Sequence, residues 1–218
     1  MATDMNMAAP GRKPAVSNIN RVLLHPAAKP ALWLICALPL ASLVWRAFSD
    51  RLGANPAEAL IHSTGEWALR WLWASLAITP LRQIFQMPGL LRFRRALGVS
   101  AFLYALLHFV AYAWLDKGLV IDDIVKDVFK RNFIFVGLAA LVLMTPLALT
   151  SFNSAIRALG GKRWQMLHKL VYAVAVLALL HFLWKKAGKN DFFEVGVYAL
   201  VLAGLLGWRF GRWSRQIA

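Results

Sequence analysis

Three histidines stand within long apolar stretches of the sequence: His108, His168 and His181. Histidine is uncommon within membrane spans, because its polar ring must find a hydrogen bond or a metal ion there. His108 in YALLHFVAY and His181 in LALLHFLW share the local sequence Leu-Leu-His-Phe. Two neutral imidazoles at similar depths on separate helices can bind opposite faces of a flat metal macrocycle, as in a bis-histidine b-type haem. A lone intramembrane histidine is hydrogen-bonded to a neighbouring helix about as often as it binds a cofactor. Three such histidines arranged by depth favour a cofactor.

His168 and His181 lie near opposite ends of one apolar stretch, Trp164 to Trp184, which reads WQMLHKLVYAVAVLALLHFLW. A separation of thirteen residues in a membrane-spanning helix corresponds to about 20 Å along the axis. The two rings would also point about 140° apart around a straight helix, toward different neighbours. We therefore expect two sites, one in each half of the membrane, with His108 and His181 in the same half.

The other candidate groups offer weaker chemistry. A zinc site needs four close ligands, often thiolates or carboxylates, which the spans scarcely provide at these depths. The single cysteine, Cys36, lies in an apolar run, so neither an internal disulfide nor an iron–sulfur cluster can be built. His62 is interpreted first as an interfacial residue that precedes a helix, with metal ligation as the alternative. Arg70 would either snorkel to the interface or pair with a haem propionate, and His25 is expected to be solvated.

The composition is that of a protein that crosses a membrane several times. Of its 218 residues 60% are hydrophobic and only 16% are charged, and the mean hydropathy is +0.56; an ordinary soluble domain is far more polar. The net charge of +15 could suit nucleic acid, but the basic residues separate apolar segments instead of forming a patch on a polar domain. We therefore expect membrane lipid around the chain and no nucleic-acid partner.

Six helical spans are predicted, at about Ala31–Phe48, Ser63–Ile84, Ala96–Leu115, Phe133–Leu149, Trp164–Trp184 and Phe192–Phe210. The second would open with a capping box from Ser63 to Glu66. Residues 1–30 lack a sustained apolar period and are predicted to be a mobile cytoplasmic arm, not a cleaved signal peptide. The expected fold is an all-α integral membrane protein, with a six-helix transmembrane domain at residues 31–210 and a short cytoplasmic tail at 211–218.

The charges of alternate connections predict the orientation, because Lys and Arg are retained on the cytoplasmic side. One set of connections holds 14 basic residues against one acid, and the other holds eight basic residues against nine acids. The first set comprises Arg12, Lys13, Arg21, Lys29, Arg82, Arg92, Arg94, Arg95, Arg157, Lys162, Arg163, Arg209, Arg212 and Arg215. Both termini are therefore expected in the cytoplasm, with His168 near that face and His108 and His181 in the outer half.

Two basic connections run directly into predicted spans. Arg94 and Arg95 precede the third span, and Lys162 and Arg163 precede the fifth. Basic side chains beside a helix N-terminus favour a phosphate group. The retention of basic residues on the cytoplasmic side would place them there as well, and it is the simpler explanation.

Four stretches of this sequence closely resemble one bacterial family, the MsrQ (formerly YedZ) proteins of the ferric-reductase-like transmembrane group. They are IHSTGEWALRWLWASLAITPLRQ, RRALGVSAFLYALLHFVAY, RNFIFVGLAALVLMTPLALTS and, most specifically, LGGKRWQMLHKLVYAVAVLALLHFLW. The resemblance covers about Ala54 to Trp184. It implies a multi-pass protein of the bacterial inner membrane that binds haem b and is associated with FMN.

The resemblance also implies a role. Members of this family are the haem-binding subunit of a periplasmic methionine sulfoxide reductase system, and they form a heterodimer with the molybdopterin subunit MsrP. They pass electrons to MsrP from the quinone pool or from a cytosolic flavin reductase, and MsrP repairs oxidised methionines. The haem-linked histidines of the family correspond to His108, His168 and His181. The chain would thus be an electron-transfer subunit and not the catalytic one.

The sequence departs from the larger ferric-reductase pattern at one position. Relatives with two haems carry a second histidine about thirteen residues before the outer one on the third span, and here Arg95 stands there. We therefore expect one outer haem, and two alternatives for His168. It either ligates a weaker second haem or supports a site for FMN or quinone, with Arg94, Arg95, Lys162 and Arg163 holding the anionic group.

Two other classes of function compete with electron transfer. Intramembrane histidines can relay protons, so the first alternative is a proton-coupled transporter or channel. The second is a purely structural partner or assembly factor. Only Gly211 to Ala218 follow the last predicted span, so no FAD or NAD(P)H domain is expected there, and the electrons would come from another molecule.

Overall fold

The computed structural model describes residues 18–188 and 190–217, and every regular element in that part of the chain is helical. The all-α prediction is therefore confirmed. The elements in chain order are α1 (Asn18–Leu24), α2 (Ala28–Phe48), α3 (Pro56–Ile84), η1 (Pro88–Phe93), α4 (Arg94–Ala111), η2 (Tyr112–Asp116), α5 (Ile121–Lys130), α6 (Asn132–Leu149), α7 (Asn153–Leu159), α8 (Gly161–His168), α9 (Leu170–Ala187) and α10 (Phe193–Ile217).

Five helical segments of the described chain are long and apolar enough to cross a membrane. They are Ala28–Phe48, Pro88–Asp116, Asn132–Leu149, Gly161–Ala187 and Phe193–Arg212. The sixth predicted span is also helical, as part of the 29-residue α3, whose length of about 44 Å exceeds a hydrocarbon core of about 30 Å. Charged residues such as Glu66, Arg70 and Arg82 lower the hydropathy of α3, so its crossing stays a prediction.

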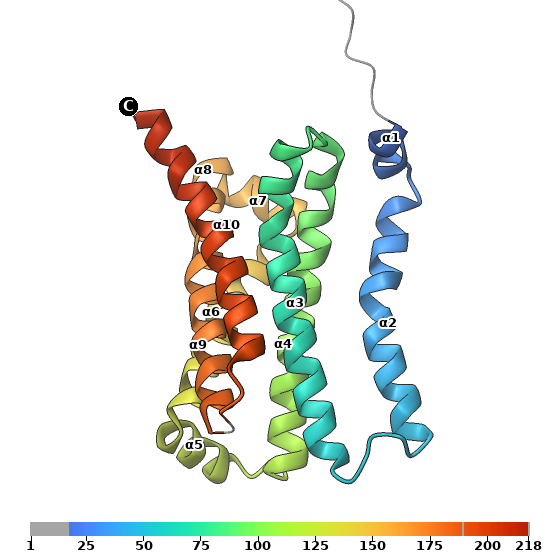
Figure 1. The fold of residues 1–218 in the computed structure, drawn as a ribbon, viewed down its shortest axis with the longest axis vertical. Helices are drawn as coiled ribbons and strands as arrows, with labels where there is room; N and C mark the ends of the chain where they lie inside the picture. Colours follow the sequence, from blue (N-terminus) through green and yellow to red (C-terminus); the bar gives the residue numbers. More distant parts are fainter. Residues whose placement is uncertain (1–17, 189, 218) are drawn as a thin grey trace, which may run out of the picture.

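The long helices run roughly parallel to one axis (Figure 1). α3 and α4 form one antiparallel pair, α6 and α9 form a second, α10 packs against α3 and α9, and α2 stands on the outer side of α3 and α4. α1, α7, α8 and the C-terminus lie at one end, which we call the basic end. α5 and the α2–α3 connection lie at the opposite end, the α5 end. The predicted division of the connections into two sets thus corresponds to two ends of the bundle.

A tyrosine of α4 is hydrogen-bonded to the backbone of α2. The hydroxyl of Tyr104 on α4 donates to the Cys36 carbonyl at 2.8 Å and accepts from the Leu40 amide at 3.0 Å. In an uninterrupted helix that amide would bond that carbonyl directly. Tyr104 is therefore inserted into the hydrogen-bond ladder of α2, next to Pro39, which lies inside the helix.

The core of the bundle lies among α3, α4, α9 and α10. Leu76, Ala101 and Val174 are almost completely buried there, with exposures of 1%, 0% and 0%. The indole of Trp73 donates to the Tyr198 carbonyl at 3.0 Å, which ties α3 to α10. This packing fixes the two helix pairs that carry the histidines.

The predicted capping box is wrong. α3 begins seven residues earlier than expected, at Pro56, and its cap is Asn55, whose side chain accepts from the Glu58 amide at 3.1 Å. Asparagine at the N-cap followed by proline is a favoured helix start. Ser63 is therefore an interior residue of α3, and His62 lies within the helix instead of preceding it.

Other boundaries differ as well. α1 lies inside the predicted N-terminal arm, of which residues 1–17 are outside the described residues, and α10 continues past Phe210 into the predicted tail. The predicted helix from Trp164 to Trp184 is divided at Lys169. The backbone amides of Lys169 and Tyr172 donate hydrogen bonds to carbonyls three residues earlier instead of four, which tightens the turn. The short helices α5 and α7 were not predicted.

Candidate functional site

The structure brings His108 and His181 together at the α5 end of the bundle. His108 lies on α4 and His181 on α9, and their ring centroids are 5.9 Å apart with an angle of 79° between the ring planes. Two metal–nitrogen bonds of about 2 Å plus the ring radii give a centroid separation of about 6 Å when two imidazoles ligate one metal from opposite sides. The spacing of this histidine pair therefore suits a shared metal centre.

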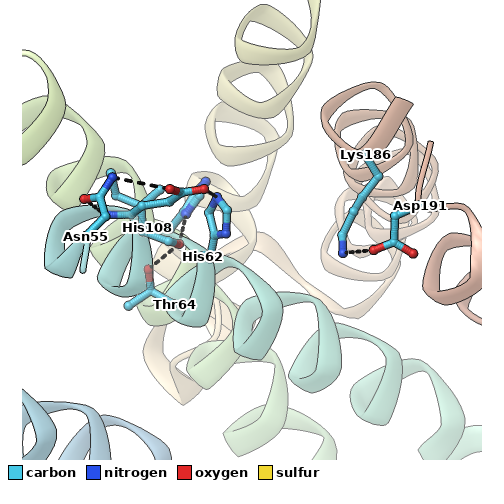
Figure 2. Close-up of polar contacts among 8 residues, drawn as sticks. Asn55, His62, Thr64, His108, Lys186 and Asp191 are labelled. Carbon is cyan, nitrogen blue, oxygen red and sulfur yellow. Dashed lines mark hydrogen bonds and ion pairs between the residues drawn. The ribbon is translucent and has the colours of Figure 1, made fainter. Parts of the chain in front are cut away.

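The Nδ1 atom of each ring is hydrogen-bonded to a backbone carbonyl. Nδ1 of His108 lies 2.7 Å from the Ile61 carbonyl oxygen on α3, and Nδ1 of His181 lies 2.6 Å from the Phe133 carbonyl oxygen on α6. Figure 2 shows His108 reaching toward α3 beside His62 and Thr64. A carbonyl can only accept, so each Nδ1 carries the proton, and Nε2 of a neutral ring keeps its lone pair. A second hydrogen bond of this kind is what orients a histidine that ligates a metal.

Two glycines give the rings access to these carbonyls. The carbonyl of residue i in an α-helix bonds the amide of residue i+4, and the residues four positions after Ile61 and Phe133 are Gly65 and Gly137. A Cβ added at Gly65 would lie 2.9 Å from Nδ1 of His108, and one at Gly137 would lie 2.6 Å from Nδ1 of His181. Each imidazole thus occupies the space that a side chain would take.

The sequence alone does not single out Gly65 and Gly137. Their only signal in the sequence is that each stands in a helix interior, where glycine costs about 1 kcal/mol relative to alanine. The α3–α4 and α6–α9 pairs therefore repeat one local arrangement, in which a glycine on one helix faces a histidine on the other.

A cavity of about 530 Å³ surrounds the histidine pair. α3, α4, α6 and α9 contribute an apolar lining around the two rings, including Ile61, Leu69, Leu72, Phe109, Phe133, Leu141, Met144 and Phe182. A volume in this range suits a cofactor-sized ligand. Two imidazoles alone cannot complete a metal site, and the described residues contain no group of three His, Cys, Asp or Glu that could hold a metal ion. A macrocycle such as haem supplies the other ligands itself, and its apolar body fits this lining.

Charged side chains line the rim of this cavity. Arg131, Lys185 and Lys186 are its cations, and Lys186 bonds Asp191 at 2.7 Å and Glu194 at 3.0 Å. Figure 2 shows the Lys186–Asp191 pair apart from the group of residues around His108. Glu58 and His62 lie at the α3 side of the rim, 3.5 Å apart. The lining also holds the acids Glu58, Glu66 and Asp116, so its charges are mixed. The three cations are the groups that the carboxylates of a ligand would approach.

Arg70 is not part of the cavity lining. Its guanidinium pairs with Glu66 at 2.9 Å and lies 4.8 Å from the centroid of the Trp67 ring. The structure thus gives it local partners on α3.

One buried carboxylate fixes the α5 end of the site. Asp127 on α5 is 8% exposed and accepts from Tyr112 at 2.7 Å, from Lys117 at 3.1 Å and from Arg131. Burial acts to raise the pKa of Asp127, but these three hydrogen bonds outweigh it and lower the pKa to about 2. Tyr112 and Arg131 also line the cavity, so Asp127 holds α5 against two lining residues.

The third histidine has a different environment at the basic end. Nε2 of His168 lies 3.1 Å from Oγ1 of Thr150, whose hydroxyl donates to the Pro146 carbonyl at 2.6 Å. Since that hydroxyl proton is used, Nε2 of His168 must be the donor, and Nδ1 keeps the lone pair. Trp164 stacks on the His168 ring at 4.0 Å between centroids and donates to the Thr150 carbonyl at 2.9 Å. His168, at the end of α8, is thus held against the C-terminal end of α6.

The four basic residues predicted beside His168 are not brought to one point. Arg94 lies within electrostatic range of His168, whereas Arg95, the residue expected to oppose it, donates to Asn153 on α7 at 2.7 Å. Lys162 and Arg163 are exposed in the first turn of α8. None of the four is among the lining residues of the cavity at the α5 end.

Comparison with known proteins gives a consistent result. The family model described as "Ferric reductase like transmembrane component" matches residues 64–179, a range that includes His108 and His168 and ends two residues before His181. Several curated relatives are named "Protein-methionine-sulfoxide reductase heme-binding subunit MsrQ". The one from Polaromonas naphthalenivorans is 57% identical over 194 residues, covering 88% of this chain and 89% of the relative. That from Ralstonia nicotianae is 50% identical over 193 residues (87% and 89%), and that from Caulobacter vibrioides 41% over 203 residues (93% and 94%).

Proposed function

This chain belongs to the MsrQ family of ferric-reductase-like transmembrane proteins, and from that premise we propose that it is a membrane electron-transfer subunit that holds haem b through His108 and His181. The observation that carries the proposal is the pair of rings 5.9 Å apart, each with Nδ1 bonded to a backbone carbonyl. The relatives named above are called heme-binding subunits of protein-methionine-sulfoxide reductase.

Each part of the cavity has a role in this proposal. The Nε2 atoms of His108 and His181 would hold the iron, and the Ile61 and Phe133 carbonyls would keep both rings in the ligating tautomer. The apolar lining excludes water and keeps the local dielectric low. Arg131 and Lys185 at the rim are candidates to pair with the propionates. When bound, haem supplies reversible one-electron transfer.

We propose that the electrons leave at the α5 end, toward a periplasmic MsrP-like molybdopterin subunit that repairs oxidised methionines. The chain is then a multi-pass protein of the bacterial inner membrane, with both termini, the arm at residues 1–30 and the tail at 211–218 in the cytoplasm. The excess of basic residues at the basic end supports this orientation. No residue of this chain acts on the methionine sulfoxide in this account.

We further propose that electrons enter at the basic end, from the quinone pool or from a cytosolic flavin reductase through FMN. His168, with Arg94 in electrostatic range, is the centre of this site, and Arg95, Lys162 and Arg163 are further cations at the same end. A second haem is less well supported, because Trp164 stacks on the His168 ring and Arg95 stands where relatives with two haems carry the second histidine.

Transfer of electrons through the whole complex is the direct test. The full-length chain would be co-reconstituted in vesicles with its MsrP-like partner, and a quinol or a flavin donor would be supplied at the basic end. We expect the haem absorbance to show reduction, followed by reoxidation when methionine sulfoxide is added outside. A chain that binds no haem, or haem that the partner never reoxidises, would contradict the proposal, and proton uptake without any redox signal would favour the transporter alternative.

A further inference from the structure

Several arginines gather where the basic end of α3 meets that of α10, and no carboxylate of the described chain lies there. Arg82 belongs to α3, Arg209 and Arg212 belong to α10, and Arg94 on α4 lies in electrostatic range of Arg209. The nine described acids all belong to the α5 half of the bundle or its connections: Asp50, Glu58, Glu66, Asp116, Asp122, Asp123, Asp127, Asp191 and Glu194. The positive charge at this junction therefore has no counter-ion in the described chain.

Arg82 and Arg209, which are half-buried, are only partly hydrogen-bonded. Arg209 donates to the Tyr172 hydroxyl and, at 2.9 Å, to the Leu76 carbonyl. These are neutral partners, so they leave its charge uncompensated. The Nε atoms of Arg209 and Arg82 are both buried and find no hydrogen-bond partner in the described part of the chain. A guanidinium held this way is costly unless an anion completes its environment.

An open groove of about 360 Å³ lies beside these arginines. It is lined by Arg82, Gln83, Gln86, Pro88 and Arg212, and Arg212 donates to the side-chain oxygen of Gln83 across it. The lining offers two guanidinium groups and two amides, but no aromatic face on which a flavin or quinone ring could stack. It therefore suits a compact, hydrogen-bonding anion.

The groove lies at the depth where lipid headgroups are found. Arg212 is the last residue of the α10 segment that is apolar enough to cross the membrane, and α3 ends at Ile84. Two exposed apolar side chains stand at the end of α3 between the groove residues Gln83 and Gln86: Ile84 and Phe85, each 58% exposed. Acyl chains could lie along this surface while a headgroup occupies the groove.

We propose that the α3–α10 groove binds the headgroup of an anionic phospholipid, with Arg82 and Arg212 bonding its phosphate and Gln83 and Gln86 its remaining oxygens. The planar guanidinium fork matches phosphate oxygens in a bidentate way, which a lysine cannot do. Basic pockets between membrane helices commonly hold such headgroups. The site is separate from the histidine cavity, and its occupation does not depend on haem or on an electron donor.

Lipid retention by the purified full-length protein tests this proposal. The double variant R82Q/R212Q would be compared with the wild type and with the matched control K29Q/R157Q, which removes two exposed charges at the same end outside the groove. Each protein in neutral detergent would be titrated with phosphatidylglycerol, diphosphatidylglycerol or phosphatidylcholine, and bound lipids would be counted by native mass spectrometry. Haem content, measured in the same samples, reports whether each variant is folded.

We expect the wild type and the control to retain an anionic lipid in preference to phosphatidylcholine. R82Q/R212Q should bind it about tenfold or more weakly, because charge-assisted hydrogen bonds are lost, with unchanged haem content. Equal anionic-lipid binding in all three proteins would overturn the site and leave only general attraction to positive charge. Full displacement of the lipid by millimolar inorganic phosphate would also overturn the lipid assignment, in favour of a soluble phosphate compound.

Discussion

The two ends of this molecule use histidine in opposite ways. At the α5 end, His108 and His181 each donate through Nδ1 to a backbone carbonyl, and their Nε2 atoms remain available inside a shared cavity. At the basic end, Nε2 of His168 donates to Thr150, Nδ1 keeps the lone pair, and Trp164 stacks on the ring. The comparison teaches that a second imidazole across a shared cavity, more than the presence of one imidazole in an apolar helix, distinguishes a candidate ligand from a supporting residue.

The largest expected effect comes from removing a ring of the histidine pair. H108A and H181A should each lose the low-spin haem signal and most of the bound haem, because a single remaining imidazole cannot ligate the iron from both sides. The measurement is the reduced-minus-oxidised spectrum with a haem-to-protein ratio. H62A is the matched control, since His62 lines the rim of the same cavity, and it should keep its haem. Full haem content in both H108A and H181A would contradict the assignment of these two histidines as haem ligands.

A smaller but still large effect is expected at the two glycines. G65A and G137A would place a Cβ 2.9 Å and 2.6 Å from Nδ1 of His108 and His181, so the ring must move away from its carbonyl. We expect reduced haem content, or an altered low-spin spectrum and reduction potential where haem is kept. G98A serves as the control, because its Cβ would meet only Ser75 Oγ, at 3.5 Å. The account of the tautomers is contradicted if G65A, G137A and G98A have identical spectra.

Substitutions at the basic end should change the rate of haem reduction and not the haem content. In H168A and R95A, we expect the haem at the α5 end to be kept, while its reduction by a quinol or flavin donor slows several-fold in H168A. The change in R95A should be smaller, because Arg95 bonds Asn153 and not His168. Stopped-flow reduction, with haem and flavin assays on the same samples, measures this. If haem content halves in H168A while flavin is unchanged, His168 ligates a second haem, and wild-type rates in both variants would remove the proposed electron-input site.

The smallest expected effect concerns Asp127, which stabilises the α5 end. Its pKa of about 2 lies below the ordinary value of 3.8. The stabilisation is therefore fully present above about pH 4 and is lost as the pH falls from about 4 toward 2. D127N should lower the melting temperature of the detergent-solubilised protein at pH 7 by a few degrees, and its difference from the wild type should shrink across that window. D122N, an exposed change on the same helix, should have no effect, and a pH-independent difference for D127N would contradict the assignment.

The sequence was sufficient to predict the helical class and that His108 and His181 lie close together on separate helices. The reason is physical: apolar runs of membrane-spanning length fix depth, and the two histidines fall at similar depths on separate helices. The carbonyls of Ile61 and Phe133 that orient the rings leave no mark in the sequence, since every residue has one. Gly65 and Gly137 could be interpreted only after their partners were known.

At the basic end the sequence was a poorer guide. The expectation that Arg95 opposes His168 came from the resemblance to relatives with two haems, which carry a histidine at that place on the third span. The straight helix expected through Trp164–Trp184 is also divided, because the tightened turn at Lys169 separates α8 from α9. Arg95 instead reaches α7, a helix too short to give a clear apolar period. The capping box from Ser63 to Glu66 failed for a related reason, because Asn55 followed by Pro56 provides an earlier and equally favourable helix start.

The central claim is that one metal centre is shared by His108 and His181, while His168 ligates none. It is tested most directly by the haem-to-protein ratio of the purified wild-type protein together with its electron paramagnetic resonance spectrum. The account predicts one haem per chain with a single low-spin signal, strongly anisotropic because the two ring planes are 79° apart. Two haems per chain, a high-spin signal, or no haem at all would contradict it.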